Sequence, residues 1–257
     1  MNLLLSRMLE CADPSQVAGL ARFFKTGPGQ YGEGDKFLGI KVPVTRAVVK
    51  ECWRSVLPAD WQDRAARGDS PFPDLEECVC SEYHEVRLAA LLALVEIFKR
   101  CHSKRCIDFY LSHTQYINNW DLVDLSCYPL LGEWLLNSDD HSLLYDLARN
   151  GRTIWEQRIG IVSTMTFVRH GQLDDTFAIA DILLHHPHDL IHKAVGWLLR
   201  EAGKRNKAAL VAFLQSPDPH AGPDPASPRY QTMPRTMLRY AIEKFPEPER
   251  KNYLQKP

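Results

Sequence analysis

Residues 85–97 read EVRLAALLALVEI, and this stretch indicates the fold class of the chain. Its apolar residues recur at intervals of three and four, which is the spacing of one face of an amphipathic helix. They are Val86, Ala89, Ala90, Ala93, Leu94 and Ile97. The same periodicity returns in residues 154–168 and 191–199, whereas alternating, strand-like runs are nearly absent. The sequence therefore predicts an all-α protein with about ten or more helices.

The helical stretches recur at a regular interval. Four of them align on a polar residue followed by an apolar run, at steps of 37, 34 and 35 residues; the four are Arg87, Asp124, Arg158 and Lys193. Helix pairs of about this length are typical of HEAT-like solenoids, in which neighbours stack because no pair can bury its apolar face alone. We therefore predict one α-helical domain over residues 1–257, a HEAT-like helical-repeat solenoid with a concave groove for a large ligand.

Composition excludes several classes of protein. The 257 residues are 45% hydrophobic and 25% charged, which is ordinary for a folded soluble chain and excludes a disordered or fibrous one. The seven cysteines are odd in number and contain no C-x-x-C pair, so we expect reduced thiols rather than a disulfide framework. No stretch approaches the ~18 apolar residues that a membrane-spanning helix needs. We expect a cytoplasmic protein without membrane contact.

The net charge of -1 hides an uneven distribution. It argues against a protein that coats nucleic acid by bulk charge. Residues 1–189 hold 19 basic and 26 acidic side chains, a balance of -7, and residues 190–257 hold 12 and 6, a balance of +6. The basic residues of the second region include Lys193, Arg200, Lys204, Arg205 and Lys207. These residues predict a basic patch that could hold a short stretch of phosphate backbone.

Three successive repeats carry aromatic and charged residues at corresponding positions. Residues 118–124 read NNWDLVD, in which Trp120 and Asp124 lie four apart and share a helix face. The next repeats offer Arg158 in TIWEQRIG, then Trp197 and Arg200 in KAVGWLLRE. Flat rings suit bases or sugars, arginine suits phosphate, and an aspartate suits a developing cation. This combination fits cleavage of an N-glycosidic bond. Alternatively, Trp120 is a core residue and Asp124 forms a cap or a salt bridge.

Four motifs together resemble the AlkD family of DNA alkylation repair proteins, which are HEAT-like-repeat DNA glycosylases. They are FLGI at 37–40, NNWDLVD, IWEQRIG and KAVGWLLRE, in the family's order and spacing, between about residues 21 and 201. The resemblance implies excision of cationic alkylated purines, such as 3-methyladenine and 7-methylguanine, from double-stranded DNA. It also implies that the base is not flipped into a pocket and that no metal or other cofactor takes part.

The resemblance also implies roles for individual residues. Trp120 and Trp197 would pack against the sugar of the lesion, and Asp124 would be the catalytic carboxylate. Arg158 would grip the phosphate beside the lesion, and Arg200 would make a second backbone contact. The family usually offers a tyrosine near the groove, where this chain has Phe23, which removes a hydroxyl but keeps a ring.

Other residues have less specific signals. Lys193, in the basic patch, and Lys41 and Arg46, which follow the FLGI motif, are candidate DNA contacts; the last two fit a solvated face equally well. We predict that Trp134 is a core residue and that Trp155 is either a core residue or a residue of the groove.

Two further segments have residues that could suggest a binding site. The glycine-rich segment Gly27 to Asp35 lacks the G-K-[ST] ending of a phosphate loop and reads as a flexible connector, which is longer than in AlkD-like proteins. The histidines around Pro187 fit a helix-entry loop better than a metal site, because no convincing third ligand accompanies them.

Three functions remain open. The first is a monomeric DNA glycosylase for alkylated purines, which the presence of Asp124 favours. The second is a non-catalytic DNA-binding paralogue that recognises distorted duplex, and the third is a HEAT-like protein-interaction scaffold. A scaffold gives no reason to place two tryptophans, an aspartate and an arginine on one face.

Overall fold

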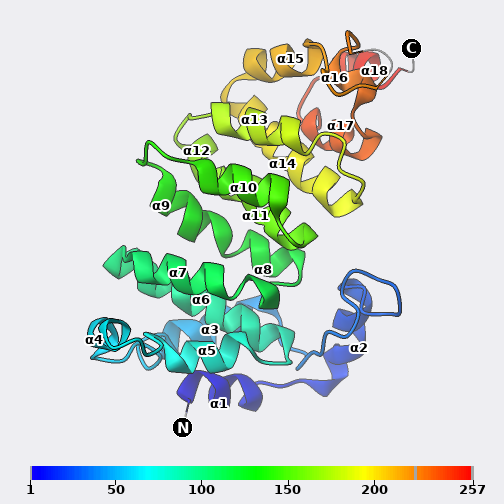
Figure 1. The fold of residues 1–257 in the computed structure, drawn as a ribbon. Coiled ribbons are helices and arrows are strands. Elements are labelled where there is room, and N and C mark those ends of the chain that lie inside the picture. The colour runs from blue at the N-terminus through cyan, green and yellow to red at the C-terminus, as the bar shows by residue number, and fades with distance from the viewer. Residues whose placement is uncertain (1, 223–224, 256–257) are drawn as a thin grey trace. The chain divides into compact units, whose positions relative to one another are not determined.

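The computed structural model describes residues 2–222 and 225–255, and the chain divides into two compact units, Met1–Ser126 and Cys127–Pro257. Both units consist of packed helices, so the predicted all-α, helical-repeat fold is confirmed (Figure 1). Extended pairing among the described residues is limited to two isolated bridges, Lys36 with Tyr83 and Pro217 with Pro228. That residues 1–257 act as one domain stays a prediction.

The first unit is organised around one long helix, α6. Its helices are α1 (Leu3–Glu10), α2 (Pro14–Phe23), α3 (Val42–Cys52), α4 (Trp61–Ala66), α5 (Pro73–Val79), α6 (His84–Cys101), α7 (Lys104–Ser112), the 3-10 helix η1 (Thr114–Tyr116) and α8 (Trp120–Asp124). Helix α6 packs against α1, α3, α5 and α7, and Figure 1 shows it surrounded by these neighbours. The six apolar positions that the periodicity assigned to one face of α6 are all buried.

The burial of α6 nevertheless exceeds the predicted amphipathic face. Every residue from His84 to Val95 is buried, including the charged side chains Glu85 and Arg87. A helix that is covered on all sides has no polar stripe, because each of its faces meets another element. Two charged residues inside such a core need specific partners, and those partners belong to the candidate site described below.

The second unit repeats a pairwise packing of helices. Its elements are the π-helical turn η2 (Tyr128–Gly132), α9 (Glu133–Leu135), α10 (Ser142–Asn150), α11 (Ile154–Ser163), α12 (Met165–Arg169), α13 (Asp174–Ile182), α14 (Asp189–Arg205), α15 (Lys207–Gln215), α16 (Arg229–Thr232), α17 (Arg235–Ala241) and α18 (Glu247–Leu254). Helix α10 packs on α11, and α14 packs on α11, α13, α15 and α17. The predicted apolar face of α14, from Ile191 to Leu199, is buried in these contacts.

Gly39 of the FLGI motif shows why that motif contains a glycine. Its φ is 87°, in the left-handed region, and a Cβ atom there would lie 1.9 Å from the carbonyl oxygen of Asp13. Only glycine permits this approach between the segment that precedes α3 and the start of α2. The backbone amide of Asp13 also donates to the carbonyl of Leu38 at 2.8 Å, so the two segments are joined at this point.

Candidate functional site

Helix α8 carries two of the predicted catalytic residues as its first and last members. It spans only Trp120–Asp124, and the side chain of its N-cap, Asn119, accepts a hydrogen bond from the backbone amide of Trp120 at 2.9 Å. Residues four apart in a helix lie on the same face, so Trp120 and Asp124 share one, as the spacing predicts. Both side chains are half-buried, which leaves part of each at the surface of the first unit.

The indole of Trp120 belongs to a cluster of aromatic rings. It stacks on Phe24, with ring centroids 5.6 Å apart and planes inclined by 24°. Phe23, at the end of α2, meets the same indole edge-on at 5.9 Å and is itself 60% exposed. Stacked and edge-to-face pairs at these separations are favourable. The structure thus brings together Phe23 and Trp120, two residues that the sequence analysis singled out separately.

A buried polar network lies beneath this cluster. The ring of His84 bridges two carboxylates, with Nδ1 3.0 Å from Oδ2 of Asp35 and Nε2 2.9 Å from Oδ2 of Asp121. Arg87 forms a short ion pair with the other oxygen of Asp35, and the Asn118 amide donates to that oxygen at 3.2 Å. The network therefore connects the end of the glycine-rich segment, the start of α6 and the first turn of α8.

The charge state of His84 follows from this environment. Burial lowers the pKa of His84, but hydrogen bonds and charge from Asp121 and Asp35 outweigh it and raise the pKa to about 9. Burial likewise raises the pKa of Asp35, and the hydrogen bond from His84 and the charge of Arg87 bring it below its ordinary value. At neutral pH the bridge is an imidazolium between two carboxylates, because only the doubly protonated ring donates from both nitrogens.

The free energy of unfolding should depend on the charge of His84. A histidine whose pKa is higher in the folded state contributes stability that is fully present below its unfolded pKa and is lost as the pH rises through its folded pKa. For His84 this window runs from 6.5 to about 9, and the contribution is about 3 kcal/mol.

We expect urea unfolding across this pH window to show the loss. The groups that face the imidazole are Asp35 and Asp121, with Arg87 on the far oxygen of Asp35. An Asp121→Asn variant should show a flatter profile, because one of the two carboxylates that raise the pKa is gone. A wild-type stability that stays constant from pH 6.5 to 9 would contradict the assignment of an imidazolium.

The network is not predicted from the sequence. Asp35 belongs to the predicted flexible connector, and neither His84 nor Asp121 is a predicted site residue. The connector is instead anchored at its end, because Asp35 has three side-chain partners and Lys36 pairs with Tyr83. One available signal was that His84, Glu85 and Arg87 interrupt an otherwise apolar helix start.

The remaining predicted site residues of the first unit lie at the start of α3. Lys41 is the N-cap of α3 and Arg46 is in its second turn, and both are exposed. Exposure is compatible with either a solvated face or phosphate contacts, so their assignment as DNA contacts stays a prediction.

In the second unit, α14 carries Lys193, Trp197 and Arg200. Trp197 is half-buried, next to Gly196, where a Cβ atom would lie 2.5 Å from Cβ of Tyr240 on α17. Arg200 forms ion pairs with Glu201, at 3.2 Å, and with Glu243, and Lys193 forms one with Asp189 at 2.7 Å.

Most residues of the predicted basic patch form ion pairs with carboxylates. Besides Lys193 and Arg200, Lys204 pairs with Glu201 at 2.8 Å and Lys207 with Glu249 at 2.7 Å. Glu201, Glu243 and Glu249 are already counted in the balance of +6, so the pairs show how that charge is distributed and leave its sum unchanged. Exposed pairs of this kind contribute about 0–1 kcal/mol, so a phosphate could still compete for the lysines.

Arg158 lies in α11 and is almost fully buried, at 5% exposed. Its Nη1 donates to the carbonyl oxygen of Leu190 at 2.5 Å, which joins α11 to the first turn of α14. The neighbouring Trp155 is also buried and therefore belongs to the core, one of its two predicted readings. Trp134 was predicted to be a core residue, and that prediction is wrong: it is 37% exposed, because α9 is a single turn at the surface.

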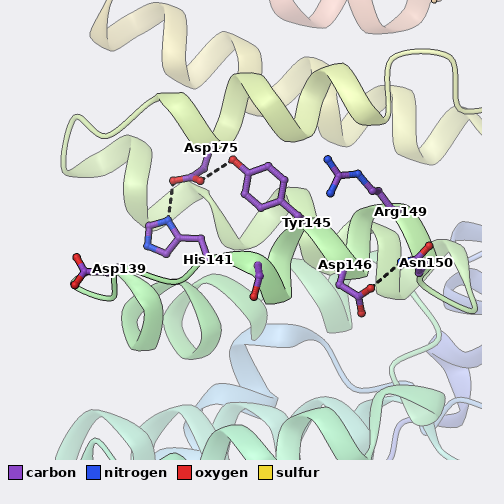
Figure 2. A pocket seen from close by; sticks show the side chains of 8 residues that line it. Asp139, His141, Tyr145, Asp146, Arg149, Asn150 and Asp175 are labelled. Carbon is purple, nitrogen blue, oxygen red and sulfur yellow. Dashed lines mark hydrogen bonds and ion pairs between the residues drawn. The ribbon is translucent and has the colours of Figure 1, made fainter.

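The second unit also contains a polar cavity of about 470 Å³ that the sequence did not indicate (Figure 2). Within it, Asp175 accepts a hydrogen bond from the Tyr145 hydroxyl at 2.8 Å and lies 2.9 Å from Nδ1 of His141. Figure 2 shows these three side chains pointing toward one another across α10 and α13. They satisfy one another, and none of the predicted site residues lines this cavity.

The histidines around Pro187 form hydrogen bonds in the loop that leads into α14 and at its N-cap. Nε2 of His185 lies 2.7 Å from Asp218, and that of His186 lies 2.9 Å from Gln157. His188 is the N-cap of α14 and accepts from the amide of Leu190 at 3.2 Å. No group of three histidine, cysteine or acidic residues that could hold a metal ion occurs within residues 2–222 and 225–255. The helix-entry interpretation agrees with these contacts.

None of the helices in the described part of the chain has the length and apolarity needed to cross a lipid bilayer.

Comparisons with known proteins agree with the motifs. A search of curated proteins found no match. Among solved structures, the chain is similar to a predicted DNA alkylation repair enzyme from Enterococcus faecalis, with a TM-score of 0.67 over 92% of this chain and 97% of that one. Sequence identity is 15%, so this likeness concerns the fold. The model of the family described as DNA alkylation repair enzyme matches residues 4–245, and the chain therefore belongs to that family.

Proposed function

We propose that this protein is a DNA glycosylase that excises cationic alkylated purines, such as 3-methyladenine and 7-methylguanine, from double-stranded DNA. It acts as a monomer, hydrolyses the N-glycosidic bond and does not flip the base into a pocket. Membership in the alkylation repair family supports the repair role. The placement of Trp120 and Asp124 on one face of α8 carries the more specific proposal.

The proposed reaction needs few catalytic groups from the protein. A purine that already bears a positive charge is a good leaving group, so no general acid has to protonate it. The sugar becomes oxocarbenium-like as the base leaves. A carboxylate can stabilise that charge and accept a proton from the attacking water, and Asp124 is the proposed group. The faces of Trp120 and Trp197 would add cation–π attraction of about 0.5–2 kcal/mol each.

The aromatic cluster supports a sugar-binding role for Trp120. Its indole is fixed by Phe24 on one side and Phe23 on another, and the exposed Phe23 extends the apolar surface around it. A ring that is held before the substrate arrives loses little freedom on binding. Phe23 lacks the hydroxyl of the family's tyrosine, so its contribution to DNA binding would be contact by its ring alone.

Arg158 would neutralise the phosphate beside the lesion, and Arg200 and Lys193 would contact the neighbouring backbone, with Lys41 and Arg46 as further contacts. Arg158 is the most constrained of these residues, because its guanidinium already donates to Leu190. A guanidinium whose orientation is fixed in this way would give a fixed direction to a phosphate contact.

An Arg158→Gln variant should bind duplex DNA more weakly than the wild type. The plot of log K against log salt concentration should become shallower by about 0.9, because one phosphate contact is lost. Fluorescence anisotropy at a series of salt concentrations measures this slope. Arg169→Gln is the matched control, since Arg169 is an exposed arginine on α12 that rests over the ring of Tyr128. Equal slopes for wild type and Arg158→Gln would contradict the phosphate role.

Base release from methylated DNA tests the function itself. Duplex DNA that contains 7-methylguanine is incubated with the protein, and the free base is quantified against spontaneous loss in a sample without protein. Release above that background supports the glycosylase. Binding without release would favour a non-catalytic paralogue that recognises distorted duplex, and neither binding nor release would favour a protein-interaction scaffold.

A further inference from the structure

Helix α8, which carries Trp120 and Asp124, is too short to fix its own orientation. Helix α8 has five residues, and backbone bonds join it to neighbouring residues from Val123 to Asn119, at 3.2 Å, from Leu125 to Asp121, at 3.0 Å, and from Ser126 to Val123, at 3.1 Å. A helix of about one turn leaves most of its terminal groups without intrahelical partners and is not stable alone. What holds α8 must therefore come from side chains that reach it from other elements.

Asp121 is a residue of α8 that a side chain from another helix contacts by a hydrogen bond. It lies next to Trp120 in the chain, is 4% exposed and receives its hydrogen bond from Nε2 of His84 at 2.9 Å. Among the described residues, its other carboxylate oxygen is buried without a hydrogen-bond partner. The bond from His84 is thus the polar contact that satisfies this carboxylate, and a buried carboxylate is costly without one.

His84 is itself fixed from two other directions. Its Nδ1 bonds to Asp35, which Arg87 and Asn118 also hold. Its ring lies 4.6 Å from the ring of Phe24 and 4.9 Å from that of Phe37. Phe24 in turn stacks on Trp120. One imidazole therefore reaches α8 twice, through the carboxylate of Asp121 and through the stacked rings that set the plane of Trp120.

We propose that His84 is a positioning residue, which fixes the orientation of α8 and thereby places Trp120 and Asp124 for base excision. The part of this proposal that concerns excision rests on the proposed glycosylase function. A rotation of α8 about its axis would displace both side chains together, because they share one face. Catalytic groups that are misplaced by about 1 Å can lose ~100-fold in rate even when the substrate still binds.

His84→Gln is the variant that tests the proposal. Glutamine carries no charge, and its single amide nitrogen cannot take the places of the two ring nitrogens that bind the two carboxylates. The matched control is His141→Gln in the second unit, which removes a comparable histidine–aspartate contact, to Asp175, outside the proposed site. Thermal unfolding of all three proteins identifies a variant that has failed to fold.

Two measurements are then made on each protein. Hydrogen exchange of the peptide that covers residues 118–126 should be faster by ~10-fold or more in His84→Gln, and unchanged in His141→Gln. The single-turnover rate of 7-methylguanine release should fall by ~10-fold or more in His84→Gln, while its affinity for the same duplex changes by less than ~3-fold. A role in stability alone would not separate rate from affinity in this way.

The outcomes separate this proposal from the proposed function. Unchanged exchange over residues 118–126 in His84→Gln would overturn it, and so would faster exchange with an unchanged rate of release. A wild type that releases no base would reject the glycosylase function instead. In that case the exchange rates alone would decide whether His84 orients α8.

Discussion

Replacing Asp124 by asparagine should lower the single-turnover rate of 7-methylguanine release by about 100-fold or more. The substitution keeps the size and most of the hydrogen-bonding capacity of the side chain but removes its negative charge. In the proposed mechanism that charge stabilises the growing positive charge of the sugar and draws a proton from the attacking water. Both effects vanish with the carboxylate, whereas Trp120, on the same face of α8, remains in place.

The affinity of the Asp124→Asn variant for DNA should be unchanged or higher than that of the wild type. A carboxylate near a phosphate backbone opposes binding, so Asp124→Asn should bind duplex as tightly as the wild type or somewhat more tightly. Asp108→Asn serves as the control, because Asp108 is an exposed residue of α7 in the same unit and pairs with Lys104. It should leave both rate and affinity unchanged. Equal release by wild type and Asp124→Asn would remove Asp124 from the mechanism.

Much of the fold could be predicted from the sequence, because helices leave a local signature. The apolar residues that the helical period places on one face of α6 and on one face of α14 are all buried, and the face shared by Trp120 and Asp124 follows from their spacing alone. The extent of burial around α6 could not be predicted, since it depends on which helices surround it. Leu88, Leu91 and Leu92 lie off the predicted face and are buried by tertiary neighbours.

The interior of the candidate site had no comparable local signature. His84 lies 49 residues from Asp35 and 37 from Asp121 along the chain, so no short motif contains the three. The contact of Phe23 and Phe24 with Trp120 is similarly distant in sequence. The ion pair of Arg200 with Glu243, on the loop after α17, is likewise formed only in the folded chain, because 43 residues separate the two.

Replacing Glu85 by glutamine should destabilise the protein more than any exposed substitution in the same region. Glu85 is 2% exposed, and its carboxylate accepts three backbone hydrogen bonds, from the amides of Leu38, Gly39 and Ile40, at 2.9, 2.9 and 3.0 Å. Glutamine offers one acceptor oxygen and an amino group that cannot accept. At least one buried amide therefore loses its partner, and we expect the free energy of unfolding to fall by about 3 kcal/mol.

Glu82→Gln is the matched control, since Glu82 lies three residues earlier and pairs with Lys36 at the surface. Its loss should change stability by less than about 0.5–1 kcal/mol in the same urea titration. The contrast matters for the candidate site because the segment that Glu85 holds directly follows Phe37, which packs against His84 and Phe24. If Glu85→Gln were as stable as Glu82→Gln, the FLGI motif would not be anchored by this carboxylate. The order of the rings beneath Trp120 would then have to come from apolar packing alone.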